Sequence, residues 1–193
     1  MRERIIKGAK ELFQVYGFRK VSMDEISKKL GISKRTIYRY FPSKERLIEE
    51  VIDAMMKPAV RKVLSSLEET KTLPRFFSLW LREISKVVSE LTPPMLDDLR
   101  NMPDLWEKIE EKRCRVIRRI VSFMKEGQER GEIRSDISFE FMGRFLFHLI
   151  VQFVNPNAIA EFEVTPPDML KNVLSIFMEG VLTEEGRKGF REG

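Results

Sequence analysis

The chain has 193 residues, of which 42% are hydrophobic and 34% charged, a composition that excludes a disordered polar chain and a fibrous one. Its single cysteine excludes an intramolecular disulfide and an all-cysteine metal site, and no apolar run is long enough to span a bilayer. The first ten residues are charged, with no apolar core of a secretory signal, so we expect a cytoplasmic protein without a membrane partner.

The positive charge is concentrated near the N-terminus. The formal net charge is +5, yet the first 50 residues carry 13 basic and 7 acidic side chains, whereas the other 143 carry 22 and 23. Between Lys28 and Arg46 there are seven basic residues and one acidic residue, Glu45. Such a local excess attracts a polyanion, nucleic acid before anionic membrane, although a solvated helical face has the same composition.

The apolar residues recur at intervals of three and four, and the prolines fall between these periodic segments. This pattern predicts an all-α protein with about nine helices. We expect the first helix over about residues 4–16, ended by Gly17. The second begins at Ser22, with Glu25 completing a capping box, and ends at Gly31.

Two more helices are predicted directly after the second. Ser33 caps a short third helix that Pro42 ends, and Ser43 caps a fourth that Pro58 kinks or breaks. The last ten residues are polar, and we expect them to be frayed. Further helices are predicted at about residues 72–91, after Pro93, and at about residues 104–130, 139–154 and 168–182.

The second and third helices are joined by a three-residue turn that contains glycine, as in a helix-turn-helix. Burial of Ile37 and Phe41 against Ile26 and Leu30 would turn the other side of the third helix to solvent. Lys44, in the first turn of the fourth helix, can reach the DNA backbone, and Ser33 starts a helix that can face a phosphate. The exposed side carries the basic, hydroxyl and aromatic groups that a major-groove reader needs: Lys34, Arg35, Thr36, Tyr38 and Arg39.

The stretch Ile5–Leu47, above all residues 21–26 and 31–44, closely resembles the TetR family of bacterial transcriptional regulators. The resemblance implies a three-helix DNA-binding domain at residues 1–47 and a larger helical-bundle domain at 48–193 that dimerises and holds a small effector. Arg35 and the pair Arg39–Tyr40 depart from the residues usual in the family, so the operator sequence is not implied. The DNA-contacting positions implied by the resemblance are Ser22, Lys34, Arg35, Thr36, Tyr38, Tyr40 and Lys44.

The two C-terminal helices are mostly apolar. In the helix at 139–154 the polar residues form one narrow stripe, so that helix needs burial on most sides. Two such helices suit an isologous four-helix dimer interface, and the alternative is that both complete the core of one protomer. The residues expected at the dimer interface are Phe141, Phe145, His148, Gln152, Leu170, Val173, Leu174 and Phe177.

The helices between are rich in methionine and aromatic residues, which line either an adaptable cavity or an ordinary core. Arg113 lies on the apolar face of the helix at 104–130, where it can snorkel to solvent, pair with a carboxylate or meet an anionic ligand. These features lead to the hypothesis of an amphipathic, anionic effector. The effector-binding residues expected are Phe77, Trp80, Trp106, Arg113, Ile117 and Phe123.

An enzymatic function is disfavoured because His148 and Cys114 lie on different predicted helices without a glycine-rich oxyanion turn. We expect no metal and no cofactor. The function expected is therefore that of a homodimeric repressor that reads a pseudo-palindromic DNA operator and is released by a small molecule. The alternatives are an effector-independent or nucleoid-organising DNA-binding protein of the same fold, and a helical enzyme whose basic segment is incidental.

Overall fold

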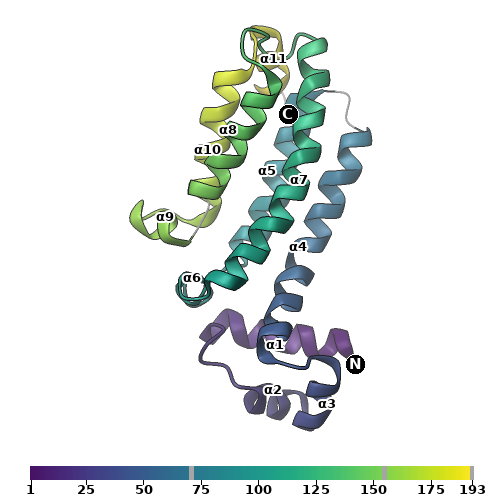
Figure 1. The fold of residues 1–193 in the computed structure, drawn as a ribbon, viewed down its shortest axis with the longest axis vertical. Helices are drawn as coiled ribbons and strands as arrows, with labels where there is room; N and C mark the ends of the chain where they lie inside the picture. The colour runs from purple at the N-terminus through teal and green to yellow at the C-terminus, as the bar shows by residue number, and fades with distance from the viewer. Residues whose placement is uncertain (70–71, 154–155, 192–193) are drawn as a thin grey trace. The chain divides into compact units, whose positions relative to one another are not determined.

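The computed structural model describes residues 1–69, 72–153 and 156–191, and this part of the chain forms eleven helices and no named strand (Figure 1). The predicted all-α class is confirmed. The prediction of about nine helices missed α9 (Pro156–Glu161) and α11 (Glu184–Arg191). None of the described helices is both long and apolar enough to cross a membrane.

The chain divides into two compact units, and the division runs through two long helices, α4 (Lys44–Glu69) and α7 (Pro103–Glu129). The first unit comprises residues 1–58 and 90–106 and contains α1 (Arg2–Tyr16), α2 (Met23–Leu30), α3 (Lys34–Tyr40) and α6 (Pro93–Arg100). The second comprises residues 59–89 and 107–193 and contains α5 (Leu73–Ser89), α8 (Phe139–Phe153), α9, α10 (Pro166–Val181) and α11. The functional boundary predicted after residue 47 stays a prediction.

The helix ends of the first unit follow the local signals in the sequence. The Ser22 hydroxyl accepts a hydrogen bond from the Glu25 amide at 3.2 Å, and the Glu25 carboxylate accepts one from the Ser22 amide at 2.7 Å, so the capping box is present. Gly31 ends α2 in the left-handed conformation at φ 63°. The side chains of Ser33 and Ser43 accept hydrogen bonds from the amides of the third residue that follows each.

The first unit is built around α1, which packs on α2 and on α6. The crossing of α1 and α2 is tight, because a Cβ atom added at Gly8 would lie 2.6 Å from a methyl carbon of Leu30. Phe13 and Phe18 are fully buried and meet edge to face, with ring centroids 5.2 Å apart. A larger side chain at position 8 would therefore require the Leu30 side chain or the helices to move.

Of the two outcomes expected at Pro58, a kink or a break, the break is wrong, because α4 continues through Pro58 to Glu69. Proline removes one amide donor, which leaves the carbonyl of Ala54 without its helical partner. Ala54 and Pro58 are both exposed, so water can satisfy that carbonyl.

The expectation of a frayed C-terminal segment is also wrong, since α11 covers Glu184–Arg191. The hydroxyl of Thr183 accepts a hydrogen bond from the Gly186 amide at 3.1 Å and donates one to the Gly131 carbonyl at 2.7 Å. The start of α11 is thus held by a helix cap and by a tertiary contact that the local sequence pattern does not predict, and residues 192–193 lie outside the described residues.

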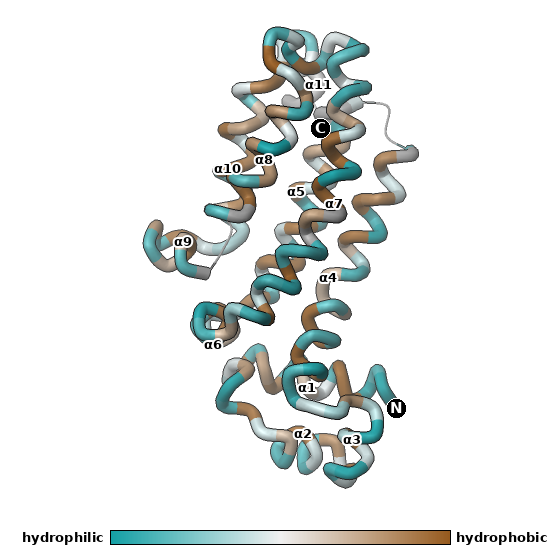
Figure 2. Tube along the Cα trace, viewed as in Figure 1, coloured by the Kyte–Doolittle hydropathy of each residue, from teal (hydrophilic) through white to brown (hydrophobic). Residues whose placement is uncertain are grey.

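In the second unit α10 packs on α5 and α8, and α11 packs on α5. Phe76 lies at the centre of an aromatic cluster, with its ring 5.5 Å from that of Phe77 and 5.3 Å from that of Phe123. Figure 2 shows hydrophobic and hydrophilic stretches alternating along α7, as expected of a helix with one buried face.

Candidate nucleic-acid interface and ligand pocket

The third helix is fixed by burial of its inner side. α3 packs on α2, Ile26 and Ile37 are fully buried, and Phe41 directly after the helix is 1% exposed. Because Ile37 faces inward, a helical periodicity of 3.6 residues turns the positions on either side of it outward. Packing on α2 therefore fixes α3 in position and leaves its other side exposed to solvent.

The free face of α3 carries large polar and aromatic groups. Arg35 and Arg39 are exposed, and Tyr38 and Tyr40 are 44% and 37% exposed. The guanidinium of Arg39 lies over the Tyr40 ring, 5.4 Å from its centroid. Guanidinium groups can donate two hydrogen bonds to a guanine edge, and tyrosine hydroxyls reach bases or phosphates. These four side chains have the exposure that direct base readout requires.

The hydroxyl groups predicted to touch DNA already serve the helix ends. The Ser33 hydroxyl accepts from the Thr36 amide at 3.1 Å and lies 2.9 Å from the Thr36 hydroxyl. The Ser22 hydroxyl donates to the Glu25 carboxylate at 2.8 Å, and the hydrogen bonds from Ser22 hold the pKa of Glu25 below its ordinary value. A contact with phosphate uses the single hydrogen of a hydroxyl, so Ser22 would have to exchange Glu25 for a phosphate, whereas the bond between Ser33 and Thr36 leaves one of their two hydroxyl hydrogens for such a contact.

Lys34 is engaged by an acidic partner that the sequence reading missed. Its ammonium lies 2.6 Å from the carboxylate of Asp24 in the first turn of α2, and this contact raises the pKa of Lys34. Both side chains are about half exposed, so the ion pair is weak and can exchange for a DNA phosphate. The spacing of ten residues across a turn gives no periodic signal for such a pair.

Lys44 is half-buried and bound to the loop that precedes α2. Its ammonium donates a hydrogen bond of 2.9 Å to the carbonyl oxygen of Arg19, and burial lowers the pKa of Lys44. The amide of Arg19 in turn donates to a carboxylate oxygen of Asp98 in α6 at 2.7 Å. Sequence reasoning did not find Asp98, because the partners are 79 positions apart.

The residues predicted to bind an effector are distributed between both units. Four of them are between 2% and 5% exposed in the second unit, where the rings of Phe77, Trp80 and Phe123 cluster with that of Phe76 and Ile117 is a buried residue of α7. Trp106 is half-buried and belongs to the first unit. The side chain of Arg113 lies outside the described residues, so its predicted role is not addressed.

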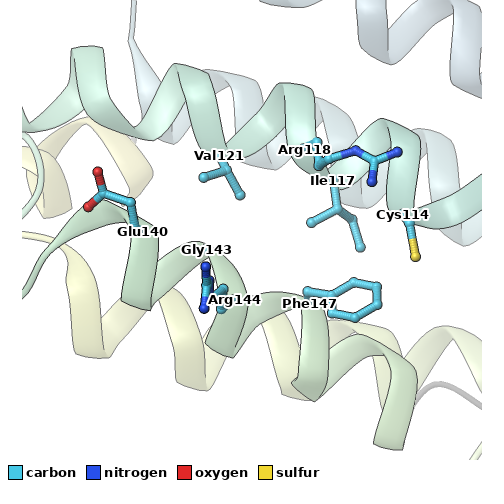
Figure 3. Close-up of a pocket in the computed structure, with 8 residues that line it drawn as sticks. All are labelled: Cys114, Ile117, Arg118, Val121, Glu140, Gly143, Arg144 and Phe147. Atoms are coloured by element: carbon cyan, nitrogen blue, oxygen red, sulfur yellow. The ribbon is translucent and has the colours of Figure 1, made fainter.

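A pocket of about 340 Å³ lies in the second unit between α7 and α8 (Figure 3). Ile117 is the one predicted effector residue among its lining residues. The helices approach closely at one end of it, since a Cβ atom added at Gly143 would lie 2.4 Å from a methyl carbon of Val121. The other lining side chains are those of Cys114, Arg118, Glu140, Arg144 and Phe147.

The residues predicted at a dimer interface fall into two groups. On α8, Phe141 and Phe145 are 60% and 49% exposed with their rings stacked at 6.2 Å, and His148 and Gln152 are exposed on the same face. On α10, the four predicted residues are at most 7% exposed because they pack inside the protomer, whereas Ile176 is 74% exposed. The four α10 residues placed in the core are Leu170, Val173, Leu174 and Phe177.

Comparisons with known proteins agree with this geometry. The family model for bacterial regulatory proteins of the tetR family matches residues 5–51. The HTH-type transcriptional regulator UidR of Escherichia coli K12 is 28% identical over 155 residues, covering 77% of this chain and 76% of UidR.

Solved structures share the fold at lower sequence identity. The regulator FadR from Bacillus subtilis in complex with stearoyl-CoA superposes with a TM-score of 0.65 at 21% identity, covering 93% of this chain and 99% of FadR. A transcriptional regulator from Saccharomonospora viridis in complex with choline gives the same TM-score and identity over 95% and 98% of the two chains. The solved structures show the fold, and the family match over residues 5–51 together with the similarity to UidR identifies the chain as a TetR-family DNA-binding transcriptional regulator rather than an enzyme.

Proposed function

We propose that the protein is a homodimeric repressor whose two α3 helices read the half-sites of a pseudo-palindromic operator, and that a small molecule bound in the C-terminal part releases it. The observation that carries the proposal is that Arg35, Tyr38, Arg39 and Tyr40 of α3 are exposed while Ile37 is buried. Two such helices one helical turn of DNA apart, about 34–36 Å, would enter successive major grooves.

The dimer is supported by the outer face of α8. Phe141 and Phe145 form an exposed aromatic pair on α8, and Ile176 is exposed on α10, which packs on α8; exposed apolar groups of this size are of the kind that monomeric proteins avoid. The same patch on a second copy is its natural cover, because a two-fold axis brings like surfaces together. In this arrangement α10 contributes Ile176, while its buried residues support the interface from within.

Release by an effector is favoured over effector-independent DNA binding by the pocket between α7 and α8. Its volume of about 340 Å³ lies within the range of small-molecule sites, about 300–1,000 Å³. FadR binds stearoyl-CoA and the Saccharomonospora regulator binds choline, so ligands of very different charge occur on this fold. An effector acts only if it binds one dimer geometry better than the other.

The proposal is tested by selecting genomic fragments that the purified protein retains, with and without metabolite extract from the cells. We expect enrichment of a pseudo-palindrome, bound several orders of magnitude more tightly than random duplex, and its loss in the extract. Retention of all duplexes alike, unaffected by extract, would favour the nucleoid-organising alternative. If the protein binds one operator tightly and no extract or metabolite lowers that affinity, only the proposed release by an effector is contradicted.

A further inference from the structure

The pocket between α7 and α8 has an apolar floor. Ile117 and Phe147 face each other across it, one from each helix, and Val121 continues the α7 side (Figure 3). Ile117 is 3% exposed, so its side chain belongs to the core as well as to the pocket. A floor of this kind binds the hydrocarbon part of a ligand through burial of apolar surface.

The charges around the floor are unevenly placed. Glu140 lies at one end with Arg144 one turn further along α8, whereas Arg118 lies towards the opposite end, near Cys114 (Figure 3). Glu140 and Arg144 form no ion pair among the described residues, but they are four residues apart on α8, a spacing at which a glutamate lowers the positive potential around an arginine. Glu140 is the acidic residue among the described lining residues, and it lies at the end of the pocket away from Arg118.

Arg118 is an exposed side chain for which the described part of the chain provides no ion pair. Other exposed arginines in the described part of the chain do form ion pairs, as Arg46 does with Glu49 at 2.8 Å. A guanidinium left free at the end of an apolar pocket is matched by a planar carboxylate, which accepts two parallel hydrogen bonds from it.

We propose that this pocket binds a small amphipathic carboxylate, with its hydrocarbon part on Ile117, Val121 and Phe147 and its carboxylate on Arg118. The proposal rests on the proposed effector-dependent function and names the chemistry of the effector. The site differs from the aromatic cluster around Phe76, which is filled by its own rings.

The test uses three ligands with the same eight-carbon chain: octanoate, octan-1-ol and octylamine, titrated into the full-length protein by calorimetry. We expect octanoate to bind about three- to tenfold more tightly than octan-1-ol, the range for a partly exposed charged contact, and octylamine to bind most weakly. Equal affinities for the three ligands, or no binding of octanoate, would overturn the proposal.

Two glutamine substitutions distinguish a specific contact with Arg118 from the general effect of removing one positive charge. Arg118→Gln should remove the preference for octanoate over octan-1-ol and leave the affinity for octan-1-ol unchanged. Arg119→Gln, the matched control, removes the same charge from the next residue of α7, which does not line the pocket, and should keep the preference. Equal losses in both variants contradict a specific contact with Arg118. Melting temperatures near that of the wild type show that both variants fold.

Cys114 provides a second readout at the same place, because it lines the pocket and is the single cysteine of the chain. Saturating octanoate should slow alkylation of this thiol severalfold in the wild type, and octylamine at the same concentration should not. Calorimetric binding without protection of Cys114 would place the ligand elsewhere and overturn the proposal.

The outcome is distinguishable from failure of the proposed function. If octanoate binds and protects Cys114 but the affinity for the operator does not change, the site is supported as a carboxylate site, and its role in releasing the operator is contradicted. Release of the operator by a metabolite that leaves Cys114 unprotected, together with no octanoate binding, supports an effector-responsive repressor and overturns this site.

Discussion

The ammonium of Lys44 donates a hydrogen bond of 2.9 Å to the carbonyl oxygen of Arg19, so the first turn of α4 is tied to the loop between α1 and α2. Asp98 of α6 accepts from the amide of the same Arg19 at 2.7 Å. One residue of this loop is thus held from two sides within the first unit. The loop leads into α2, on which α3 packs, so we expect both contacts to contribute to the position of these two helices.

Lys44 remains the predicted phosphate contact of α4, because its ammonium has three hydrogens and the Arg19 carbonyl uses one. Lys44→Ala should weaken binding to all duplexes alike and reduce the slope of log affinity against log salt by about one. Gel shifts at several salt concentrations measure both quantities. Lys57→Ala removes an equal charge from an exposed site of the same helix and serves as control. An unchanged salt slope for Lys44→Ala would show that Lys44 does not contact a DNA phosphate and that its role is the hydrogen bond to the loop.

Arg35 should determine sequence preference rather than general affinity, since it is exposed on the face of α3 opposite Ile37. Arg35→Ala should cost about 1–3 kcal/mol on the best operator and much less on duplexes altered at one base pair of each half-site. Competition binding with a library of operator variants identifies that base pair. Loss of the same size on every duplex would make Arg35 a phosphate contact.

Local signals explain why much of the first unit could be predicted. The capping box at Ser22, the glycine at 31 and the buried position of Ile37 each depend on residues within one or two helical turns. The contacts that escaped prediction join distant segments: Lys34 with Asp24 across a turn, and Arg19 with Asp98 over 79 positions.

The second unit was harder to predict for the same reason. An apolar helix such as α10 can bury its residues inside the protomer or against a partner. The apolar residues recur with the same spacing in both cases, so the sequence does not distinguish them. The structure places Leu170 and Phe177 inside and leaves Ile176 outside. Likewise, the pocket between α7 and α8 depends on the approach of Gly143 to Val121, which the sequence of neither helix reveals.

The capping box should make the stability of the chain depend on acid pH through Glu25. Hydrogen bonds from Ser22 lower the pKa of this carboxyl in the folded state, so its stabilising contribution is present above the ordinary pKa of 4.5. The contribution is lost as the pH falls through the lowered value. Glu25→Gln should therefore lower the melting temperature at neutral pH, and the difference from the wild type should vanish in acid. A difference that is independent of pH would mean that the charge of Glu25 contributes nothing.

The proposed dimer should depend on the aromatic pair of α8. Phe145→Glu places a charge on an exposed ring that stacks on Phe141, and burying that charge in an interface would cost several kcal/mol. We expect monomers in sedimentation experiments, with loss of tight binding to the full operator. Phe162→Glu is the control, because Phe162 is 52% exposed and lies outside the proposed interface. Dimers of unchanged stability in Phe145→Glu would exclude this face.

Asp98 should support DNA binding without touching DNA, because it holds the amide of Arg19 ahead of α2. Asp98→Ala leaves that amide without its acceptor and should lower the free energy of unfolding by about 1 kcal/mol. Affinity for the operator should fall with it, while the salt slope stays unchanged because no phosphate contact is lost. Asp97→Ala is the matched control, since Asp97 forms an exposed pair with Arg100 at 2.6 Å that contributes little. Thermal unfolding and gel shifts compare the two variants. Equal behaviour of both would show that the loop before α2 keeps its conformation without Asp98, and that α6 has no part in presenting the recognition helix.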